Sequence, residues 1–189
     1  EKCKNYILKT KPDWVINTAA YTNVNLAEEE QIQALKINGY GPQIIAQSLK
    51  ESGGKMIQIS TDYVFDGFSK KPYKVDDKKN PINSYGSSKE YGENAVERIL
   101  GPNNQVVILR TSWLMSHRGN NFVKTILNLL SKKDEISVIK DQIGSLTSTY
   151  SLAKACRKII EKFSYSKKEL PLRMHWSNVG SASWFEIAT

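Results

Sequence analysis

A chain of 189 residues with 40 % hydrophobic and 24 % charged residues has the composition of a soluble globular protein with one sizeable core. Two cysteines, no secretory signal and no apolar run near the roughly 18 residues of a membrane span exclude a disulfide framework and a membrane protein, so we expect a cytoplasmic location. The net charge of +8 comes from scattered lysine pairs with no recognition helix or aromatic-basic stripe, which argues against a nucleic-acid partner.

The first third of the chain predicts two buried strands joined by a helix. A turn leading into a strand is predicted at 11–17, and a second buried strand at 55–60. Between them, the apolar spacing predicts a long helix from about 26 to 50, kinked at Pro42 because proline removes a helical hydrogen bond. The nearby glycines of 39–41 are not a phosphate loop, since the third glycine and a leading strand are missing.

The rest of the chain continues the alternation of strands and helices. A polar stretch at 66–83 is longer than most connections, and loops of this length often form the walls of active sites. The expected strands are 105–110, 136–139 and 173–176. The expected helices are about 84–99, 121–130, one around 150–163, and one capped by 181–183.

This alternation predicts an α/β fold with a doubly wound parallel sheet, Rossmann-like and NAD(P)-binding. Such a sheet begins with a strand and a glycine-rich turn that seats the pyrophosphate on a helix N-terminus. No such turn is present, so we expect an N-terminally truncated, internal segment of a longer protein. Residues 1–115 are expected to form a partial cofactor domain. Residues 116–189 are expected to contribute to a small C-terminal substrate lobe, interleaved with the sheet in a single compact unit.

Tyr85 and Lys89 stand four residues apart in a predicted helix, and therefore on one face, one turn from each other. An ammonium there would lower a tyrosine pKa that is ordinarily about 10, so that the phenol exchanges a proton near neutral pH. Thr61 follows the second buried strand, at the sheet edge where ligands bind, and its hydroxyl would hydrogen-bond the same substrate oxygen. Tyr150 and Lys154 share the spacing, but an apolar stripe on their helix predicts a structural role.

A series of short motifs runs in order across nearly the whole chain. They are Pro12-Asp13, Asn17–Thr22, Ile59–Gly67, Asn80-Pro81, Tyr85–Lys89, Arg110–Trp113, Asn121–Lys124, Asp141–Ser145 and Ser183-Trp184. Together they resemble the extended short-chain dehydrogenase/reductases, and within them the dTDP-4-dehydrorhamnose reductase family. The resemblance implies a nucleotide-sugar reductase that transfers a hydride from NADPH (or NADH) to the C4 ketone of dTDP-4-dehydro-L-rhamnose, giving dTDP-L-rhamnose.

The resemblance also implies roles for individual residues. Thr61, Tyr85 and Lys89 would be the catalytic set, in which Tyr85 protonates the developing alkoxide, Thr61 polarises the carbonyl and Lys89 holds the nicotinamide ribose. Cofactor contacts would come from Ala19, Ala20, Thr22, Tyr85 and Lys89. Substrate contacts would come from Tyr63, Trp113 and Gln142. Members of the family are often dimers, so a homodimer is implied; the acidic ligands of the magnesium found in some members have no match here, so no metal site is expected.

Some positions depart from the family pattern on the substrate side, which leaves the exact nucleotide sugar open. Asn25, Leu146 and Ser151 stand where the family has Asp, Pro and Asp. Two alternatives remain: an NAD-dependent nucleotide-sugar epimerase or dehydratase of the same superfamily, and a non-catalytic relative such as a methionine adenosyltransferase regulatory subunit. An intact catalytic set argues against the second. Without the glycine-rich turn, this chain alone is expected to be inactive, to bind NADPH weakly and to associate through an open strand edge.

Overall fold

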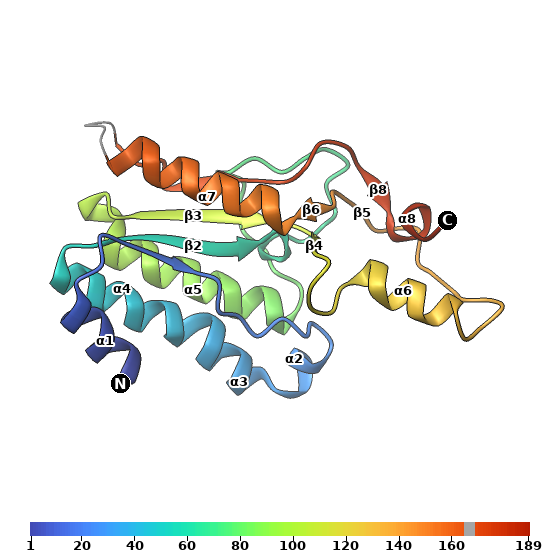
Figure 1. The fold of residues 1–189 in the computed structure, drawn as a ribbon, viewed down its shortest axis with the longest axis horizontal. Helices are drawn as coiled ribbons and strands as arrows, with labels where there is room; N and C mark the ends of the chain where they lie inside the picture. Colours follow the sequence, from blue (N-terminus) through green and yellow to red (C-terminus); the bar gives the residue numbers. More distant parts are fainter. Residues whose placement is uncertain (165–168) are drawn as a thin grey trace. The chain divides into compact units, whose positions relative to one another are not determined.

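The main sheet of the computed structural model, which describes residues 1–164 and 169–189, has four strands in the order β1-β2-β3-β7. The strands are β1 (Trp14–Asn17), β2 (Lys55–Thr61), β3 (Val106–Thr111) and β7 (Arg173–His175). β1 pairs with β2 and β3 pairs with β7, both in parallel (Figure 1). The predicted α/β fold with a parallel sheet is therefore confirmed.

The chain divides into two compact units, which interleave in sequence. The first unit comprises Glu1–Arg110 and Ile159–His175, and it contains the four-stranded sheet. The second comprises Thr111–Lys158 and Trp176–Thr189. The assignment of 1–115 to a cofactor domain and of 116–189 to a substrate lobe stays a prediction.

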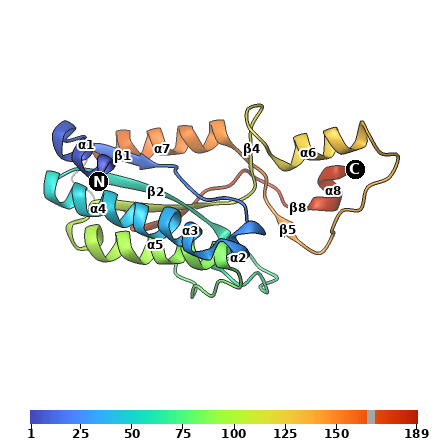
Figure 2. The same ribbon diagram turned by 90° about the horizontal axis from the view of Figure 1, so that it is seen from below.

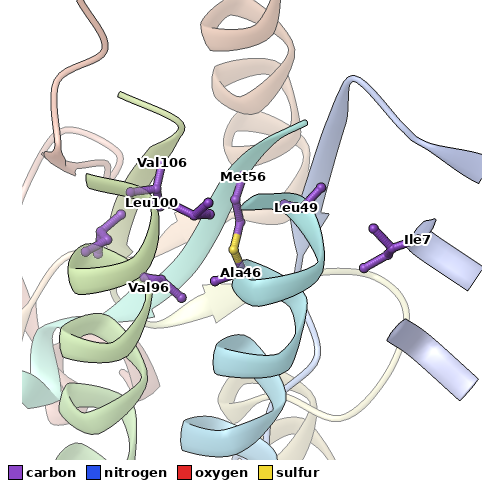
Figure 3. Packing of buried hydrophobic residues seen from close by; sticks show 8 residues of the cluster. Ile7, Ala46, Leu49, Met56, Val96, Leu100 and Val106 are labelled. Carbon is purple, nitrogen blue, oxygen red and sulfur yellow. The ribbon is translucent and has the colours of Figure 1, made fainter. Parts of the chain in front are cut away.

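The two central strands hold the core of the first unit together. Every residue of β3, and every residue of β2 after Lys55, is buried, as expected for a parallel strand covered on both faces. Met56 and Ile108 pack with Leu49 of α4 (Gly41–Ser52) and Val96 of α5 (Ser84–Leu100), as Figure 3 shows for part of this cluster. Burying each such side chain contributes about 1.5–3 kcal/mol, which fixes both helices against the sheet.

Helices cover both faces of the sheet. α4 and α5 run side by side on one face in both views (Figure 1, Figure 2). On the other face lies the C-terminal part of α7 (Thr149–Ser164), where Trp14 Nε1 donates to Ser164 Oγ at 3.0 Å. α1 (Lys2–Thr10) was not predicted; Ile7 is its single buried side chain.

The helix predicted between 26 and 50 is confirmed in outline, but it is interrupted at Glu30 and contains a π-helical turn. The segment forms α2 (Leu26–Glu29), α3 (Gln31–Leu35), a π-helical turn (Lys36–Tyr40) and α4. Residues 31–52 form an unbroken run of helical backbone, and Pro42 lies inside it, directly after the π-helical turn. A proline there removes one helical hydrogen bond, and the widened turn precedes it. The π-helical turn directly before it carries Asn38, whose side chain is buried. A widened turn of this kind is frequent at functional sites.

In the second unit, the strand predicted at 136–139 is absent. Within the described residues no strand pairs with this segment, and the Ile139 side chain is 52 % exposed. The short strands that form instead are β4 (Leu114–Met115) with β6 (Thr147–Ser148), and β5 (Ile143–Gly144) with β8 (Ala182–Ser183). The predicted helices are confirmed as α6 (Phe122–Leu130), α7 and α8 (Trp184–Ala188), the last with a capping box at Ser183. No helix in the described ranges has both the length and the hydropathy needed to cross a membrane.

Candidate active site

Thr61 lies at the carboxyl end of β2, where the strand gives way to a short 3-10 helix, η2 (Asp62–Val64). Its hydroxyl oxygen accepts a hydrogen bond from the Tyr63 backbone N–H at 3.2 Å, which caps this helix. The same hydroxyl donates to Asp62 Oδ1 at 3.0 Å. A buried strand and a cap therefore hold the Thr61 hydroxyl in one place.

The first turn of α5 packs directly on η2. Asn83 caps α5 by accepting from the Gly86 N–H at 2.7 Å. Gly86 has no side chain to keep the two backbones apart, since a Cβ there would lie 2.2 Å from the Tyr63 carbonyl oxygen. As a result the rings of Tyr85 and Tyr63 meet edge to face, with centroids 5.5 Å apart. The side chain of Thr61 also acts on the Tyr85 phenol and lowers its pKa.

Lys89 lies one turn further along α5 and is 5 % exposed. Its Nζ donates to the Ile59 carbonyl oxygen of β2 at 2.8 Å. Burial lowers the pKa of Lys89 to about 8, against the opposing effect of the Glu93 carboxylate. The structure thus brings Thr61, Tyr63, Tyr85 and Lys89 together at the end of β2, as the sequence predicted.

The expected lowering of the Tyr85 pKa by Lys89 was wrong for this arrangement. Burial is the largest influence and raises the pKa of Tyr85 to about 12, and the charge of Asp62 and the Tyr63 phenol act in the same direction. The side chain of Thr61 acts in the opposite direction and lowers this pKa. Tyr85 therefore keeps its proton at neutral pH, which suits a proton donor better than a proton acceptor.

The three residues predicted to line a cofactor lie in the segment that follows β1. Ala19 and Thr22 are exposed and Ala20 is half-buried. Buried Asn38 holds this segment, accepting from the Tyr21 N–H at 2.9 Å and donating to the Tyr21 carbonyl at 3.0 Å. Asn38 Nδ2 also donates to Ser88 Oγ at 2.9 Å, so one amide links the segment to the residue before Lys89.

A buried ion pair that the sequence analysis missed lies behind Lys89. Arg110, at the end of β3, donates from Nε and Nη2 to the two carboxylate oxygens of Glu93 at 2.9 and 2.8 Å. Lys79 Nζ approaches the same carboxylate at 3.4 Å. The sequence held a signal for this pair. Arg110 follows an apolar strand, and Glu93 lies four residues after Lys89 on the same helix face.

The long loop 66–83 is held by this ion pair. Arg110 Nη1 donates to the Val75 carbonyl at 3.0 Å, and its guanidinium lies 5.0 Å from the centre of the Phe65 ring. The Asp66 carboxylate accepts a hydrogen bond from the Tyr73 hydroxyl at 2.6 Å, and this bond is the largest of the influences that lower the pKa of Asp66. The loop is thus anchored in the first unit, on the same guanidinium that binds Glu93.

In the second unit, the predicted substrate residues Trp113 and Gln142 both contact Trp184. The indoles of Trp113 and Trp184 stack with centroids 3.6 Å apart, and Trp184 Nε1 donates to Gln142 Oε1 at 3.3 Å. Gly144 permits this packing, because a Cβ there would lie 2.7 Å from the Trp113 ring. Trp113 has a φ of 43°, a left-handed conformation that costs a bulky residue about 1–3 kcal/mol and is found most often at functional sites.

The second Tyr/Lys pair of equal spacing has no such surroundings. Tyr150 is 68 % exposed, and Lys154 lies over its ring at 4.4 Å from the centroid. The opposite side of α7 carries the predicted buried stripe, including Leu152, Cys156 and Phe163.

In residues 1–164 and 169–189, no three His, Cys, Asp or Glu side chains come together in a way that could hold a metal ion.

Known proteins with similar sequences point to one family. Residues 1–189 match the family described as the RmlD substrate binding domain. The spore coat polysaccharide biosynthesis protein SpsK of Bacillus subtilis is 43 % identical over 95 % of this chain and 60 % of its own length. A dTDP-4-dehydrorhamnose reductase of Sinorhizobium fredii is 42 % identical over 94 % of this chain and 59 % of its own. The chain thus spans about three fifths of the length of these relatives.

Solved structures agree with this result. A dTDP-4-dehydrorhamnose reductase of Bacillus anthracis, in complex with NADP, is 40 % identical with a TM-score of 0.90, covering 99 % of this chain and 64 % of that one. The UDP-glucose 4-epimerase of Brucella ovis, at 19 % identity and a TM-score of 0.82, shares the fold alone. The match over the whole chain and the identity to several dTDP-4-dehydrorhamnose reductases show that this chain belongs to the RmlD substrate-binding domain family.

Proposed function

We propose that this chain is the catalytic core of a nucleotide-sugar reductase that uses NADPH to reduce the C4 ketone of dTDP-4-dehydro-L-rhamnose. The observation that carries the proposal is the grouping of three side chains at the carboxyl end of β2: Thr61, Tyr85 and Lys89. The ring of Tyr63, two residues after Thr61, meets the Tyr85 ring, and Lys89 binds the Ile59 carbonyl of β2. The names of the relatives support the substrate, and the NADP bound in the Bacillus anthracis structure supports the cofactor. A homodimer and a cytoplasmic location stay predictions.

The segment that follows β1 has the small side chains that a nicotinamide ring would need in order to approach the backbone. Two alanines, Ala19 and Ala20, leave the backbone open to a planar ring at the carboxyl end of a parallel strand. We propose that they hold the cofactor together with Thr22, Tyr85 and Lys89. When bound, the cofactor would supply the hydride that reduces the ketone carbon.

The chain's own contribution to the reaction would be a proton and its placement. As the ketone carbon is reduced, the oxygen gains negative charge, and the Tyr85 hydroxyl gives it a proton. A pKa of about 12 keeps that proton on Tyr85 until the alkoxide forms. Lys89, charged below its pKa of about 8 and fixed by the Ile59 carbonyl, would stabilise the phenolate that remains. Tyr63, Trp113 and Gln142 are the proposed contacts to the sugar nucleotide.

NADPH consumption tests this function directly in the natural gene product that contains this sequence. With dTDP-4-dehydro-L-rhamnose, we expect one NADPH to be oxidised for each dTDP-L-rhamnose formed. With dTDP-glucose as a matched control, which has no ketone, we expect no oxidation. Interconversion of sugar epimers without net NADPH use, or no reaction with the keto sugar, would contradict the reductase assignment.

Trp113→Ala separates a substrate contact from a core position. We expect a several-fold rise in KM for the nucleotide sugar with a modest change in melting temperature, because the side chain is half-buried. Truncation of a core tryptophan would instead cost about 3–5 kcal/mol of stability. Trp113→Phe, which keeps an aromatic ring, should recover most of the KM. A large fall in melting temperature with unchanged KM would show that Trp113 is a core residue.

A further inference from the structure

The Trp184 indole contacts both of the second-unit residues proposed to bind the sugar nucleotide, Trp113 and Gln142, yet the proposed mechanism gives it no role. Its ring stacks on the Trp113 indole, with centroids 3.6 Å apart and planes 16° from parallel. Its Nε1 donates to Gln142 Oε1 at 3.3 Å. The centroid of the Phe122 ring lies 4.2 Å from that of Trp184. One indole thus joins the aromatic and the amide contact in a single cluster within the second unit.

The backbone that carries Trp184 is fixed on its N-terminal side. β8, which ends at Ser183, pairs with β5, which begins directly after Gln142. The Ser183 side chain is buried and caps α8, since its Oγ accepts from the Glu186 N–H at 3.1 Å. The Ser183 N–H in turn donates to Glu186 Oε2 at 2.6 Å. The strand pair and the capping box therefore place the Trp184 ring beside Gln142 without the help of a ligand.

Trp113 has a backbone conformation that depends on its surroundings. Its φ of 43° lies in the left-handed region, where a bulky residue persists only if neighbouring groups hold it. The Trp113 carbonyl accepts from the Thr147 N–H at 3.0 Å, which holds the backbone. The indole packs on Gly144 and stacks on Trp184, and a stacked ring pair is favourable beyond the area that it buries. The Trp113 side chain is only half-buried, so part of it remains accessible to a ligand.

We propose that Trp184 is a positioning residue for the sugar nucleotide: its indole holds the side chains of Trp113 and Gln142 in the orientation in which they bind the ligand. The inference rests on the proposed function for the identity of that ligand, but not for the stacked geometry. Trp184 acts through residues that contact the substrate, not through the proton donor. Its removal should therefore raise the KM for the nucleotide sugar and leave kcat nearly unchanged.

The stacked geometry has a spectroscopic signature in the natural gene product that contains this sequence. Two indoles in contact couple their electronic transitions, which gives a pair of far-ultraviolet circular-dichroism bands of opposite sign. We expect the wild-type spectrum minus that of Trp113→Phe, or of Trp184→Phe, to show the same pair of bands. Trp14→Phe, which changes an indole of the first unit, should give no such pair. Absence of the paired bands from both difference spectra would overturn the stacking and with it the positioning role.

A double-mutant cycle gives the functional readout. Isothermal titration with dTDP-L-rhamnose, the product of the proposed reaction, measures binding without turnover. We expect Trp184→Ala to weaken binding several-fold in the wild-type background and much less in Trp113→Ala, because the two rings act as a unit. Trp184→Phe keeps a ring against Trp113 and should recover most of the affinity. Trp14→Phe should bind like wild type. If Trp184→Ala does not fold, Trp184→Leu, which keeps apolar bulk but cannot stack, takes its place.

The possible failures can be told apart. Wild-type affinity in a folded Trp184→Ala or Trp184→Leu, or equal fold-changes with and without Trp113, would overturn the positioning role. So would a wild-type protein that does not bind dTDP-L-rhamnose. If the wild type bound this nucleotide sugar but reduced no keto sugar, the proposed function would fail, while the double-mutant cycle would still decide the role of Trp184.

Discussion

Tyr85→Phe is expected to lower the turnover of the proposed reductase by roughly 10²–10⁴-fold, with little change in substrate affinity. Phenylalanine keeps the ring that meets Tyr63 edge to face, and it removes the hydroxyl that we propose as the proton donor to the alkoxide. A single hydroxyl that takes part in one hydrogen bond contributes only about 0.5–1.5 kcal/mol to stability. Folding should therefore be nearly unaffected while the chemical step is impaired.

Steady-state NADPH oxidation and a thermal melt, measured on the same preparation, check this expectation. Tyr150→Phe is the matched control, because Tyr150 has a lysine at the same spacing but is exposed. We expect that control to retain wild-type turnover. If Tyr85→Phe retained most of its activity with the keto sugar, Tyr85 could not be the proton donor.

Glu93→Gln is expected to destabilise the protein by about 3–5 kcal/mol, the largest stability effect that we predict. The substitution leaves Arg110 buried without its counter-ion, and breaking one partner of a buried pair costs more than the pair itself contributes. Arg110 also holds the Val75 carbonyl, so the long loop should loosen together with α5. Urea unfolding followed by circular dichroism gives the free energy of unfolding for both proteins.

Glu97→Gln is the matched control on the same helix, because Glu97 pairs with Arg173 at a partly exposed position. Its cost should be at most about 1 kcal/mol.

The difference in free energy of unfolding between wild type and Glu93→Gln should also depend on pH. Burial raises the pKa of Glu93, but the hydrogen bonds and charge of Arg110 outweigh it, so the folded pKa is lowered. The contribution of the pair is therefore present above the unfolded glutamate pKa of about 4.3 and is lost as the pH falls through the folded value. Equal effects of both substitutions at neutral pH would contradict a buried, paired Glu93.

Local patterns were sufficient to predict the parallel strands and the cluster of Thr61, Tyr85 and Lys89. β3 begins with the apolar run Val106–Leu109, and β2 carries Met56, Ile57 and Ile59; residues at the carboxyl ends of these strands meet at one edge of the sheet. The direction of the Tyr85 pKa shift could not be read in this way. Spacing along a helix reveals the lysine one turn away, whereas burial and the Asp62 carboxylate come from tertiary packing.

The remaining errors have similar physical causes. The Glu93–Arg110 pair joins a helix to the strand that follows it, so the periodicity of neither element predicts the contact. The strand expected at 136–139 has suitable side chains, but in the part of the chain that the structure describes it has no partner strand. The π-helical turn before Pro42 depends on burying Asn38 between Tyr21 and Ser88, which are remote in sequence.

The close approach of Gly86 to the Tyr63 carbonyl shows which positions of the five-residue motif Tyr85–Lys89 are constrained by the structure. The second position excludes any side chain, because a Cβ would overlap a backbone oxygen. The fourth position, Ser88, accepts the Asn38 amide, and the third, Ser87, is exposed and carries no such constraint. Tyr-Gly-x-Ser-Lys is therefore the informative pattern in this chain. It separates Tyr85 from Tyr150, which is followed by Ser151-Leu152-Ala153, and a library for redesign of this helix could vary Ser87 while leaving Gly86 untouched.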